Sequence, residues 1–532
     1  MGHPICLVEI HGKDESFELS SGAPPYGLSP TSDLIEVKTD KSISAERPAG
    51  AFEIRLVNRK DDDRGRTWMD KVHPQDVVVI QMMNHQGTTG KHGAGEMHTV
   101  MIGLVDTITE STGISSRGVP QRQIVVRGRD MGKLFTHGIV TYWNFLGATT
   151  LGAQEFIVAA KLNDTPDQVI ERLLKDIYQR FLHISLVVHG ESKEFWDYLG
   201  YQLLSYGAEL PFGLDKNFLM SEGTFWSFFV KAASLPFHEL FIDTRRQSEV
   251  SNVLETQEGS TSSVPLRTLG KDGSAPTLVM RPTPFPYLTP PPLTGKIAPL
   301  PPQSDPNVLQ LPNIDVTPEQ VVMGSAWDAL VQHEIGDDDL TGESIDDGVS
   351  RSDAEQYNVY LVFPHYAWLP ERQFLLNVPA VIDEARFHKY GYRPLMPYST
   401  LIQAPGYDGA NDPMIQFYTK LTWRLASWHV FNDTFLSGYK TFKLQPQIHV
   451  GEKLLDRSTW KVRPEVYYVE SVSHHFVQNE KATTTVGLTR GLSKDDYEKY
   501  AQFLLEPGKL GYASGGTIRE TWIKLTTPEV PS

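Results

Sequence analysis

The chain has 532 residues, of which 40% are hydrophobic and 10% aromatic, and its formal net charge at pH 7 is −16. At roughly 100 to 200 residues per domain, this length indicates about three or four domains. The acidic balance disfavours binding to nucleic-acid phosphates and anionic membranes, and the single cysteine, Cys6, excludes an intramolecular disulfide framework and a cysteine-based zinc site.

No segment predicts membrane targeting. The N-terminus, MGHPICLVEIHG, has no basic stretch followed by an apolar core, and no apolar run reaches the roughly 20 residues that span a bilayer. We therefore expect a protein that is made and assembled in a cytoplasm, with no membrane partner and no specific nucleic-acid binding.

The N-terminal part of the chain has the pattern of β structure. Hydrophobic and polar residues alternate over 52–56, and apolar segments follow at 78–82 and 100–104. Strands this close in sequence indicate hairpins, so we expect residues 1–140 to form a small β-barrel module. The Gly-rich segment Asn84–Met97 fits a long exposed loop between two of the strands.

Residues 141–255 are expected to form a mixed domain with helices. A helix is predicted over 165–181, because its first four residues, Thr-Pro-Asp-Gln, offer an N-cap, a proline at the first helical position and a reciprocal Gln. A second helix is predicted over 224–235. The segment 237–243 is predicted to be a strand that pairs with 277–281.

The composition changes twice in the middle of the chain. Residues 256–320 are rich in proline, which disfavours ladders and helix interiors, so this segment is expected to be extended. Residues 321–435 are expected to form a second mixed α/β domain with helices over 381–390 and 413–431. An acidic segment over 337–355 is predicted to be an exposed loop.

One β pattern occurs twice. The first copy has Val105–Thr109, a polar turn and a strand that closes on Arg127, and the second has Val469–Ser473, a turn and a strand that closes on Arg490. The spacing from the leading valine to the closing arginine differs by one residue. Since internal repeats constrain architecture, we expect residues 436–492 to be a second β-barrel module.

The segments that precede these strands correspond in order as well. Phe52–Leu56 corresponds to Thr441–Leu444, and Asp76–Val78 corresponds to Glu452–Leu454. The predicted fold class is a multidomain α+β protein with two related small β-barrel modules separated by mixed helix and strand domains. Residues 493–532 are expected to form a C-terminal helix and tail.

No group of residues predicts catalysis, a cofactor or a metal site. His238 and Glu239 begin like a zinc-protease helix, but Ile242 stands where the second histidine is required. Residues 87–91 lack the glycine and hydroxyl positions of a phosphate loop. Histidines in a Gly-rich exposed loop are more often solvated than metal-bound, and this applies to His85, His92 and His98. We expect no enzyme activity, no cofactor and no metal.

Several segments together resemble a known family. In chain order they are Met101–Thr109, Ile124–Leu134, Phe225–Leu235, Phe237–Asp243, Leu278–Phe285, Pro446–Leu454 and Tyr467–Leu492. Their series is similar to the baseplate hub proteins of phage-type contractile tails, the late control protein D group. The resemblance implies two related β-barrel modules per chain and brings no catalytic residues.

The resemblance also implies a function. Three chains with two similar barrels each would present six near-equivalent units in a ring, which can join a six-fold tail tube to a three-fold spike. The implied partners are two further copies of the chain, a tail tube or tube-initiator protein, a central spike protein and other baseplate proteins. The implied location is the tail baseplate of a virion.

Two alternatives belong to other functional classes. The first is a tail-associated cell-wall hydrolase, although residues 493–532 after the second module are too few for a usual enzyme domain. The second is a receptor- or glycan-binding tail-tip protein, in which exposed aromatic side chains and the loop over 84–97 would contact the ligand.

The two modules also suggest a subunit interface. Strands Val466–Val472 and Val100–Ile108 carry apolar residues on both faces, which is more than a barrel with one wet face needs. In a trimer, edge strands of the two copies should pair or pack between chains, which would also hide edges prone to aggregation. The interface candidates are Tyr467, Tyr468, Val469, Arg490 and Arg127.

Overall fold

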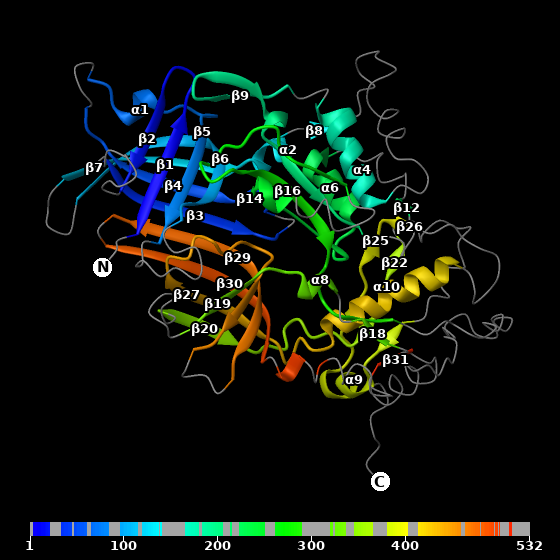
Figure 1. The fold of residues 1–532 in the computed structure, drawn as a ribbon. Helices are drawn as coiled ribbons and strands as arrows, with labels where there is room; N and C mark the ends of the chain where they lie inside the picture. Colours follow the sequence, from blue (N-terminus) through cyan, green and yellow to red (C-terminus); the bar gives the residue numbers. More distant parts are fainter. Residues whose placement is uncertain are drawn as a thin grey trace, which may run out of the picture.

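The computed structural model describes residues 4–21, 33–44, 47–60, 65–84, 96–114, 120–137, 139–140, 165–179, 183–205, 213–214, 223–250, 261–289, 320–322, 325–336, 345–364, 380–402, 413–458, 463–478, 480–493, 495–497, 500 and 510–512. These residues form mixed helix and strand structure with mostly antiparallel sheets, the largest of which has 13 strands (Figure 1). Most of the predicted loop over 84–97, with His85 and His92, and most of the proline-rich segment lie outside the described residues.

The N-terminal half of the large sheet contains seven antiparallel strands in the order β2-β1-β5-β6-β7-β4-β3. Their bounds are β1 (Ile5–His11), β2 (Ser16–Ser20), β3 (Leu34–Ser42), β4 (Ala51–Val57), β5 (Val77–Met83), β6 (His98–Ile114) and β7 (Pro120–Asp130). Buried side chains from all seven strands meet in one core. The alternation over 52–56 is confirmed, because Phe52, Ile54 and Leu56 point into this core.

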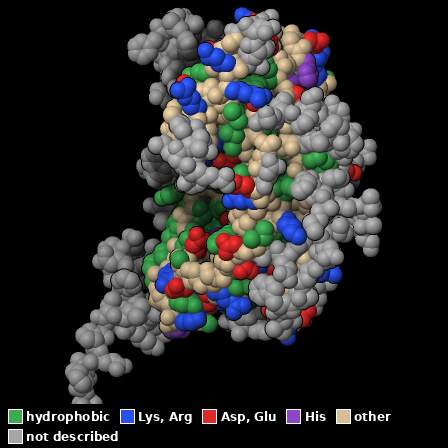
Figure 2. Space-filling view, turned by 90° about the vertical axis from the view of Figure 1, so that its left-hand side faces the viewer, with side chains coloured by type: hydrophobic (Ala, Val, Ile, Leu, Met, Phe, Trp, Pro, Cys, Tyr) green, Lys and Arg blue, Asp and Glu red, His purple; other side chains and the backbone are tan. Residues whose placement is uncertain are grey.

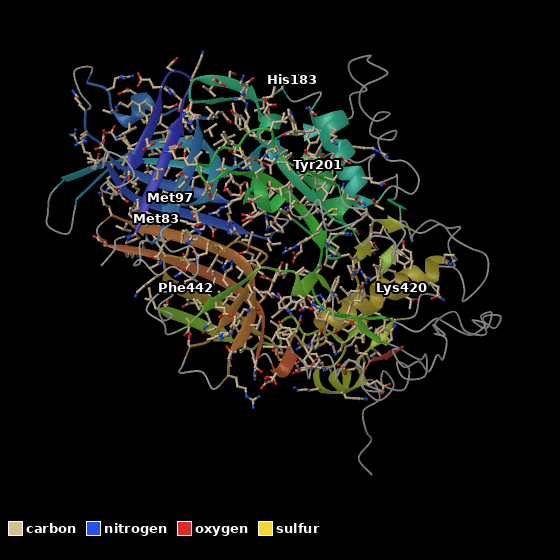
Figure 3. The ribbon with its side chains drawn as sticks, viewed as in Figure 1. Met83, Met97, His183, Tyr201, Lys420 and Phe442 are labelled. Atoms are coloured by element: carbon tan, nitrogen blue, oxygen red, sulfur yellow. The ribbon has the colours of Figure 1, made fainter. Side chains whose placement is uncertain are left out.

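The C-terminal half continues from β3 in the order β29-β30-β27-β20, and β28 pairs with both β29 and β19. Its strands are β19 (Gln332–Ile335), β20 (Asp346–Ser350), β27 (Leu436–Lys443), β28 (Lys453–Asp456), β29 (Glu465–Val477) and β30 (Lys481–Ser493). Phe442, labelled in Figure 3, is fully buried in the core of this half.

One expectation needs correction, and a second is not confirmed. The predicted acidic loop contains strand β20, because pairing with β27 outweighs the low strand propensity of Asp and Gly. The expectation of two β-barrel modules is not confirmed, because the described ladders form one continuous sheet and none of them joins β2 to β3 or β19 to β20.

Five strands follow the same order in both halves. They are β5-β6-β7-β4-β3 in the first half and β28-β29-β30-β27-β20 in the second. Each half has a β-bulge at the same place, between Val105 and Thr107 in β6 and between Val469 and Ser471 in β29. Val105 therefore corresponds to Val469, as the repeat predicts.

The turn that precedes the bulge is repeated as well. The Val105 amide donates to the Asp76 carbonyl at 3.0 Å, and the Val469 amide donates to the Glu452 carbonyl at 3.0 Å. The residue before each acidic residue, a Gln in one copy and a Gly in the other, has a φ of 75° and 78°, respectively. The predicted correspondence of Asp76 with Glu452 is confirmed.

The predicted match of Arg127 with Arg490 is wrong. Val105 faces Gly128, just after Arg127, whereas Val469 faces Leu488, which comes before Arg490. Because the first hairpin is longer, nearly equal spacing in sequence does not give equal positions in the ladder. The ladder position of Arg127 is occupied by Gly487 in the second copy.

A four-stranded sheet packs beside the large one. Its order is β14-β16-β11-β15, with bounds β11 (Gly200–Leu203), β14 (His238–Arg246), β15 (Thr261–Ser263) and β16 (Ser274–Pro282). The predicted pairing of 237–243 with 277–281 is confirmed, because β14 and β16 are antiparallel and Asp243 faces Thr277.

Helices form where the capping residues predict them. The Thr165–Gln168 capping box precedes α4 (Pro166–Arg172), which continues as the π-helix η2 (Leu173–Tyr178), and Thr224 caps α6 (Phe225–Ala233). Helix α9 (Glu384–Tyr390) starts later than predicted, because Asp383 is its N-cap. The other helices that the structure describes are α1 (Trp68–Lys71), α2 (Gly132–His137), η3 (Phe195–Asp197), α8 (Ser325–Asp328) and α10 (Pro413–His429).

The remaining strands among the described residues are short. Five pairs are β8 (Ile139–Val140) with β13 (Gly223–Thr224), β9 (Ser185–Val188) with β10 (Glu191–Glu194), β12 (Gly213–Leu214) with β26 (Leu401–Ile402), β17 (Tyr287–Thr289) with β18 (Gln320–Val322), and β22 (Phe363–Pro364) with β25 (Tyr398–Ser399). A further sheet has the order β24-β21-β23-β31, from Pro394–Leu395, Val359–Tyr360, Val381–Ile382 and Gly511–Tyr512.

Candidate functional site

The two halves of the large sheet join at one seam, the ladder between β3 and β29. Seven antiparallel pairs run from Ser42 opposite Ser471 to Glu36 opposite Val477. Strand β29 is long enough to take two partners on the same side, because β28 pairs only with its first part, Glu465–Tyr468. The seam is therefore a contact between the edge strand of one copy and the open part of a central strand of the other.

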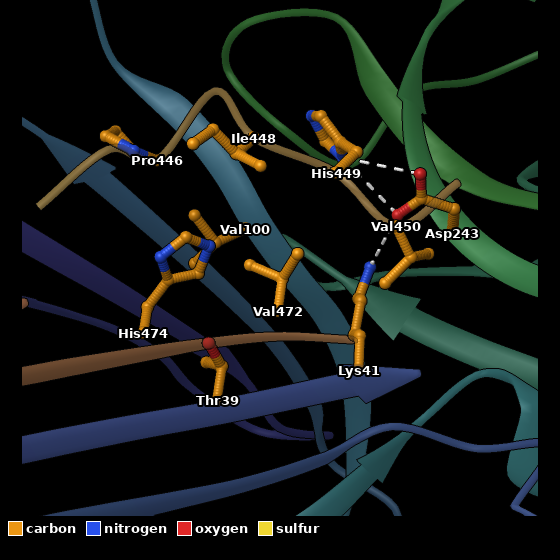
Figure 4. A pocket seen from close by; sticks show the side chains of 10 residues that line it. All are labelled: Thr39, Lys41, Val100, Asp243, Pro446, Ile448, His449, Val450, Val472 and His474. Carbon is orange, nitrogen blue, oxygen red and sulfur yellow. Dashed lines mark hydrogen bonds and ion pairs between the residues drawn. The ribbon is translucent and has the colours of Figure 1, made fainter. Parts of the chain in front are cut away.

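A small cavity lies against the inner side of the seam. Its volume is about 10 Å³, which is close to the space that one water molecule needs. It is lined by Thr39, Lys41, Val100, Asp243, Pro446, Ile448, His449, Val450, Val472 and His474 (Figure 4). These residues come from both halves of the sheet and from β14, so the cavity marks the point where three parts of the chain meet.

A buried ion-pair cluster borders this cavity. The Lys41 ammonium lies 3.2 Å from Asp243 Oδ1 and donates a hydrogen bond of 2.7 Å to Thr244 Oγ1. The His449 Nδ1 atom lies 3.3 Å from Asp243 Oδ2 (Figure 4). Lys41, Asp243 and His449 belong respectively to the first half, to β14 and to the second half, so their charges connect all three parts.

The cluster shifts the pKa values of its members. Burial raises the pKa of Asp243, but the nearby His449 and Lys41 outweigh burial and hold this pKa well below its usual range. Burial lowers the pKa of His449, but Asp243 outweighs that effect and raises it above its usual value. Burial raises the pKa of the neighbouring Asp130 to about 6, although the Gly50 and Gly132 amides donate to its carboxylate.

His474 and His475 point to opposite sides of the seam, as expected for neighbours in a strand. His474 is buried, and its Nδ1 lies 2.9 Å from Thr484 Oγ1. Burial and the positive groups around it lower the pKa of His474 to about 3. On the other side, His475 Nε2 lies 2.7 Å from Glu36 Oε1 and so links the two strands of the seam.

The tyrosines predicted at a subunit interface lie inside the chain. Tyr467, Tyr468 and Val469 are at most 2% exposed. The Tyr468 hydroxyl donates to the Glu239 carboxylate and accepts from Arg281 Nη2 at 3.2 Å. Since β14 and β16 cover this part of β29, its apolar residues need no neighbouring subunit, and the reason for expecting an interface there no longer holds.

The two predicted arginines also have partners within the chain. The Arg490 guanidinium lies 3.7 Å from the centre of the Phe285 ring and donates to the Trp428 carbonyl near the end of α10. This carbonyl is at a helix C-terminus, where a positive charge is favoured. Arg127 is largely exposed and donates from Nε to Glu53 Oε2 at 2.8 Å.

One group among the described residues could hold a metal ion. Ligand atoms of Glu9, His11 and His189 lie within 4.8 Å of one another. Lys271 Nζ already pairs with Glu9 at 2.8 Å, which supplies the positive charge that the carboxylate needs. His11 Nδ1 lies 3.2 Å from the Ser16 hydroxyl. These contacts involve Glu9 and one ring nitrogen of His11, and the His189 ring lies edge-on to the His11 ring with centroids 4.4 Å apart.

The other candidates for chemistry have structural partners. His98 Nδ1 accepts a hydrogen bond of 3.2 Å from Arg246, and burial lowers the pKa of His98 to about 4. His238 lies in strand β14 and not in a helix, and its Nδ1 donates to the Ala233 carbonyl at 2.7 Å. Cys6 is fully buried, which raises the pKa of its thiol and leaves it inaccessible.

Sequence reasoning missed the cluster of Lys41, Asp243 and His449. The one available signal was a charged residue inside an apolar strand, Asp243 at the end of FHELFID. Lys41 and Asp243 are 202 residues apart, so no local spacing connects them. Within the part of the chain that the structure describes, no helix has both the length and the apolar character needed to cross a membrane.

Comparison with known proteins gives only distant likenesses. No protein-family model and no curated protein matches the chain. Among solved structures, the 43 kDa tail protein of prophage MuSo2 from Shewanella oneidensis is 11% identical with a TM-score of 0.43, and the match covers 92% of this chain and 97% of that chain. A tail protein from Neisseria meningitidis MC58 is 10% identical with a TM-score of 0.42, over 91% and 96% of the two chains.

Prophage tail protein gp18 from Listeria monocytogenes EGD-e is 8% identical with a TM-score of 0.38, over 93% of this chain and 97% of that chain. All three similar structures are tail proteins, two of them from prophages, and each match runs over nearly the whole length of both chains. At such identities and scores, the likeness transfers no residue role and no activity to this chain.

Proposed function

We propose that this chain is a structural hub subunit of a phage or phage-like tail baseplate, in which three copies form a ring that joins a six-fold tail tube to a three-fold spike. The observation that carries the proposal is the seam. One chain contains the same five-strand order twice, and the edge strand of the first copy pairs with the central strand of the second.

The seam is a contact between different surfaces of two similar units. Contacts of this kind, repeated by rotation, generate closed rings or open filaments. If the contact within the chain is repeated between chains, three chains give a ring of six units. Such a ring has three-fold symmetry in sequence and near six-fold symmetry in shape, which fits an adaptor between partners of different symmetry.

In this proposal the charged groups around the seam cavity have a structural role. The titratable groups around the seam cavity are held in ion pairs and hydrogen bonds that tie strands together. The cavity itself has space for about one water molecule. In this proposal the partners are a tail tube or tube-initiator protein, a central spike and other baseplate proteins, and the location is the tail of the virion.

Light scattering on the purified protein tests the proposal. The expected mass is three times the chain mass of 59.8 kDa, and it should stay constant on dilution, since a ring that buries strand edges is expected to be tight. A monomer or dimer at micromolar concentration would refute the ring. Incubation with purified peptidoglycan is expected to release no soluble fragments, and release would favour a cell-wall hydrolase.

A further inference from the structure

Two strand edges are left open at places that the repeat makes equivalent to the seam. Strand β6 pairs with β5 only as far as Leu104, and beyond its bulge the segment Thr107–Gly113 has β7 on one side and no described ladder on the other. The corresponding part of β29 is covered by β3. Residues 109–113 are exposed, whereas alternate residues of the covered part of β29 are buried.

The second open edge is β20. Its counterpart β3 pairs with β4 on one side and with β29 on the other. Strand β20 pairs with β27 on one side, and no described ladder occupies the other side. Two large apolar side chains beside β20 are exposed, Ile345 at 59% and Tyr439 at 43%. An exposed strand edge with apolar neighbours is a ready template for another chain.

The two edges lie far apart along the sheet of one chain. Along the sheet the order from one to the other is β6-β7-β4-β3-β29-β30-β27-β20, so seven strand spacings separate them. At about 4.8 Å per spacing this is about 34 Å along the sheet. Figure 1 accordingly shows β20 and β6 in different halves of the molecule. A strand from a second copy of the chain can complete each edge.

We propose that β20 of one chain pairs antiparallel with the outer part of β6 in a second copy, in the register of the seam. This inference rests on the proposed ring and specifies the contact that closes it. Counting from the shared bulge, Ser473 of β29 is equivalent to Thr109 of β6. Counting through the ladders with β4 and β27, Asp40 of β3 is equivalent to Ser350 of β20. Since Asp40 faces Ser473 in the seam, Ser350 faces Thr109 between chains.

The same mapping places Val349 opposite Glu110 and Gly348 opposite Ser111. It also puts Arg351, which follows β20, diagonal to Glu110, within reach of an ion pair across the contact. The face of the molecule drawn in Figure 2 carries acidic and basic side chains interspersed over its described part. A contact built on backbone hydrogen bonds and paired charges suits such a surface, because strand addition takes its affinity mainly from the backbone.

Engineered cysteines test the register. The only native cysteine, Cys6, is fully buried, so it is not expected to form cross-links between chains. Directly opposed residues in an antiparallel pair have Cα atoms about 4.5–5.5 Å apart, which falls within the range of a disulfide. The variant Ser350→Cys with Thr109→Cys is therefore expected to give covalent dimers and trimers on a non-reducing gel after mild oxidation.

The matched control is Ser350→Cys with Glu110→Cys. Successive side chains point to opposite faces of a strand, so this pair is expected to cross-link at least ten times less. Light scattering of the reduced variants separates the outcomes. A trimer that cross-links no better in the opposed pair than in the control would overturn the β20–β6 contact and leave the ring standing, whereas a monomeric wild-type protein would overturn both.

Discussion

Replacing Lys41 with methionine tests whether the buried ion pair holds the seam together. The Lys41 side chain is 9% exposed, and its ammonium contacts both Asp243 and Thr244. Methionine has a similar length and no charge, so the substitution removes the charge with little change in volume. Lys38→Met on the same strand is the matched control, because Lys38 is 44% exposed and pairs with Glu36 at 2.9 Å.

Lys41→Met and Lys38→Met are expected to lower the free energy of opening the seam by clearly different amounts. Removing one member of a buried ion pair costs about 3–5 kcal/mol, because the other charge stays buried without its partner. Asp243 keeps His449 at 3.3 Å and Arg245 at 3.5 Å, so we expect Lys41→Met to fall near the lower end, at about 3 kcal/mol. Lys38→Met should cost about 0–1 kcal/mol, as exposed ion pairs do.

Native-state hydrogen exchange of the amides in β3 and β29 is the appropriate assay, because it reports the free energy of opening the seam locally even where global unfolding is not two-state. The double variant Lys41→Met with Asp243→Asn should recover part of the loss, since it removes both charges of the pair. Equal destabilisation by Lys41→Met and Lys38→Met, or no recovery in the double variant, would show that the ion pair does not stabilise the seam.

Three further predictions concern the seam and its neighbours. His474 should stay unprotonated at pH 5, because its pKa in the folded protein is about 3 and lies below the unfolded value near 6.5. The stability that this group contributes is therefore present above pH 6.5 and falls by about 2 kcal/mol between pH 7 and pH 5. An NMR titration midpoint near 6.5 for His474 would contradict this prediction. Gly128→Ala should lower the free energy of unfolding by about 1–3 kcal/mol, because the added Cβ would overlap the Phe52 ring. Gly336→Ala is the control and should leave the melting temperature unchanged, because the nearest atom to its added Cβ is 3.6 Å away. Tyr468→Asp should lower the melting temperature at every protein concentration, because it buries an unpaired carboxylate inside one chain; a loss that depended on concentration would instead place this residue at a subunit contact.

Local chemistry was readable from the sequence. The capping box at Thr165 needs only residues within one turn, and the helix starts where it predicts. The repeat was readable because two strands and the turn before them keep their order in both copies, down to the bulge after Val105 and Val469. These features depend on contacts between residues that are close in the chain or that follow each other in hairpins.

Only the tertiary structure decided which edges meet. The ladder that pairs Glu36 with Val477 joins strands from opposite ends of the chain, and no periodicity records that choice. The same holds for β20, whose Asp and Gly residues are poor strand formers until β27 supplies a partner. Apolar residues on both faces of a strand indicate that both faces are covered, but they do not indicate what covers them. For this reason the sequence suggested that Tyr467 and Tyr468 contact another subunit. The sheet formed by β14 and β16 covers this region from within the chain. Because these strands are far from β29 in sequence, the sequence pattern could not predict this contact.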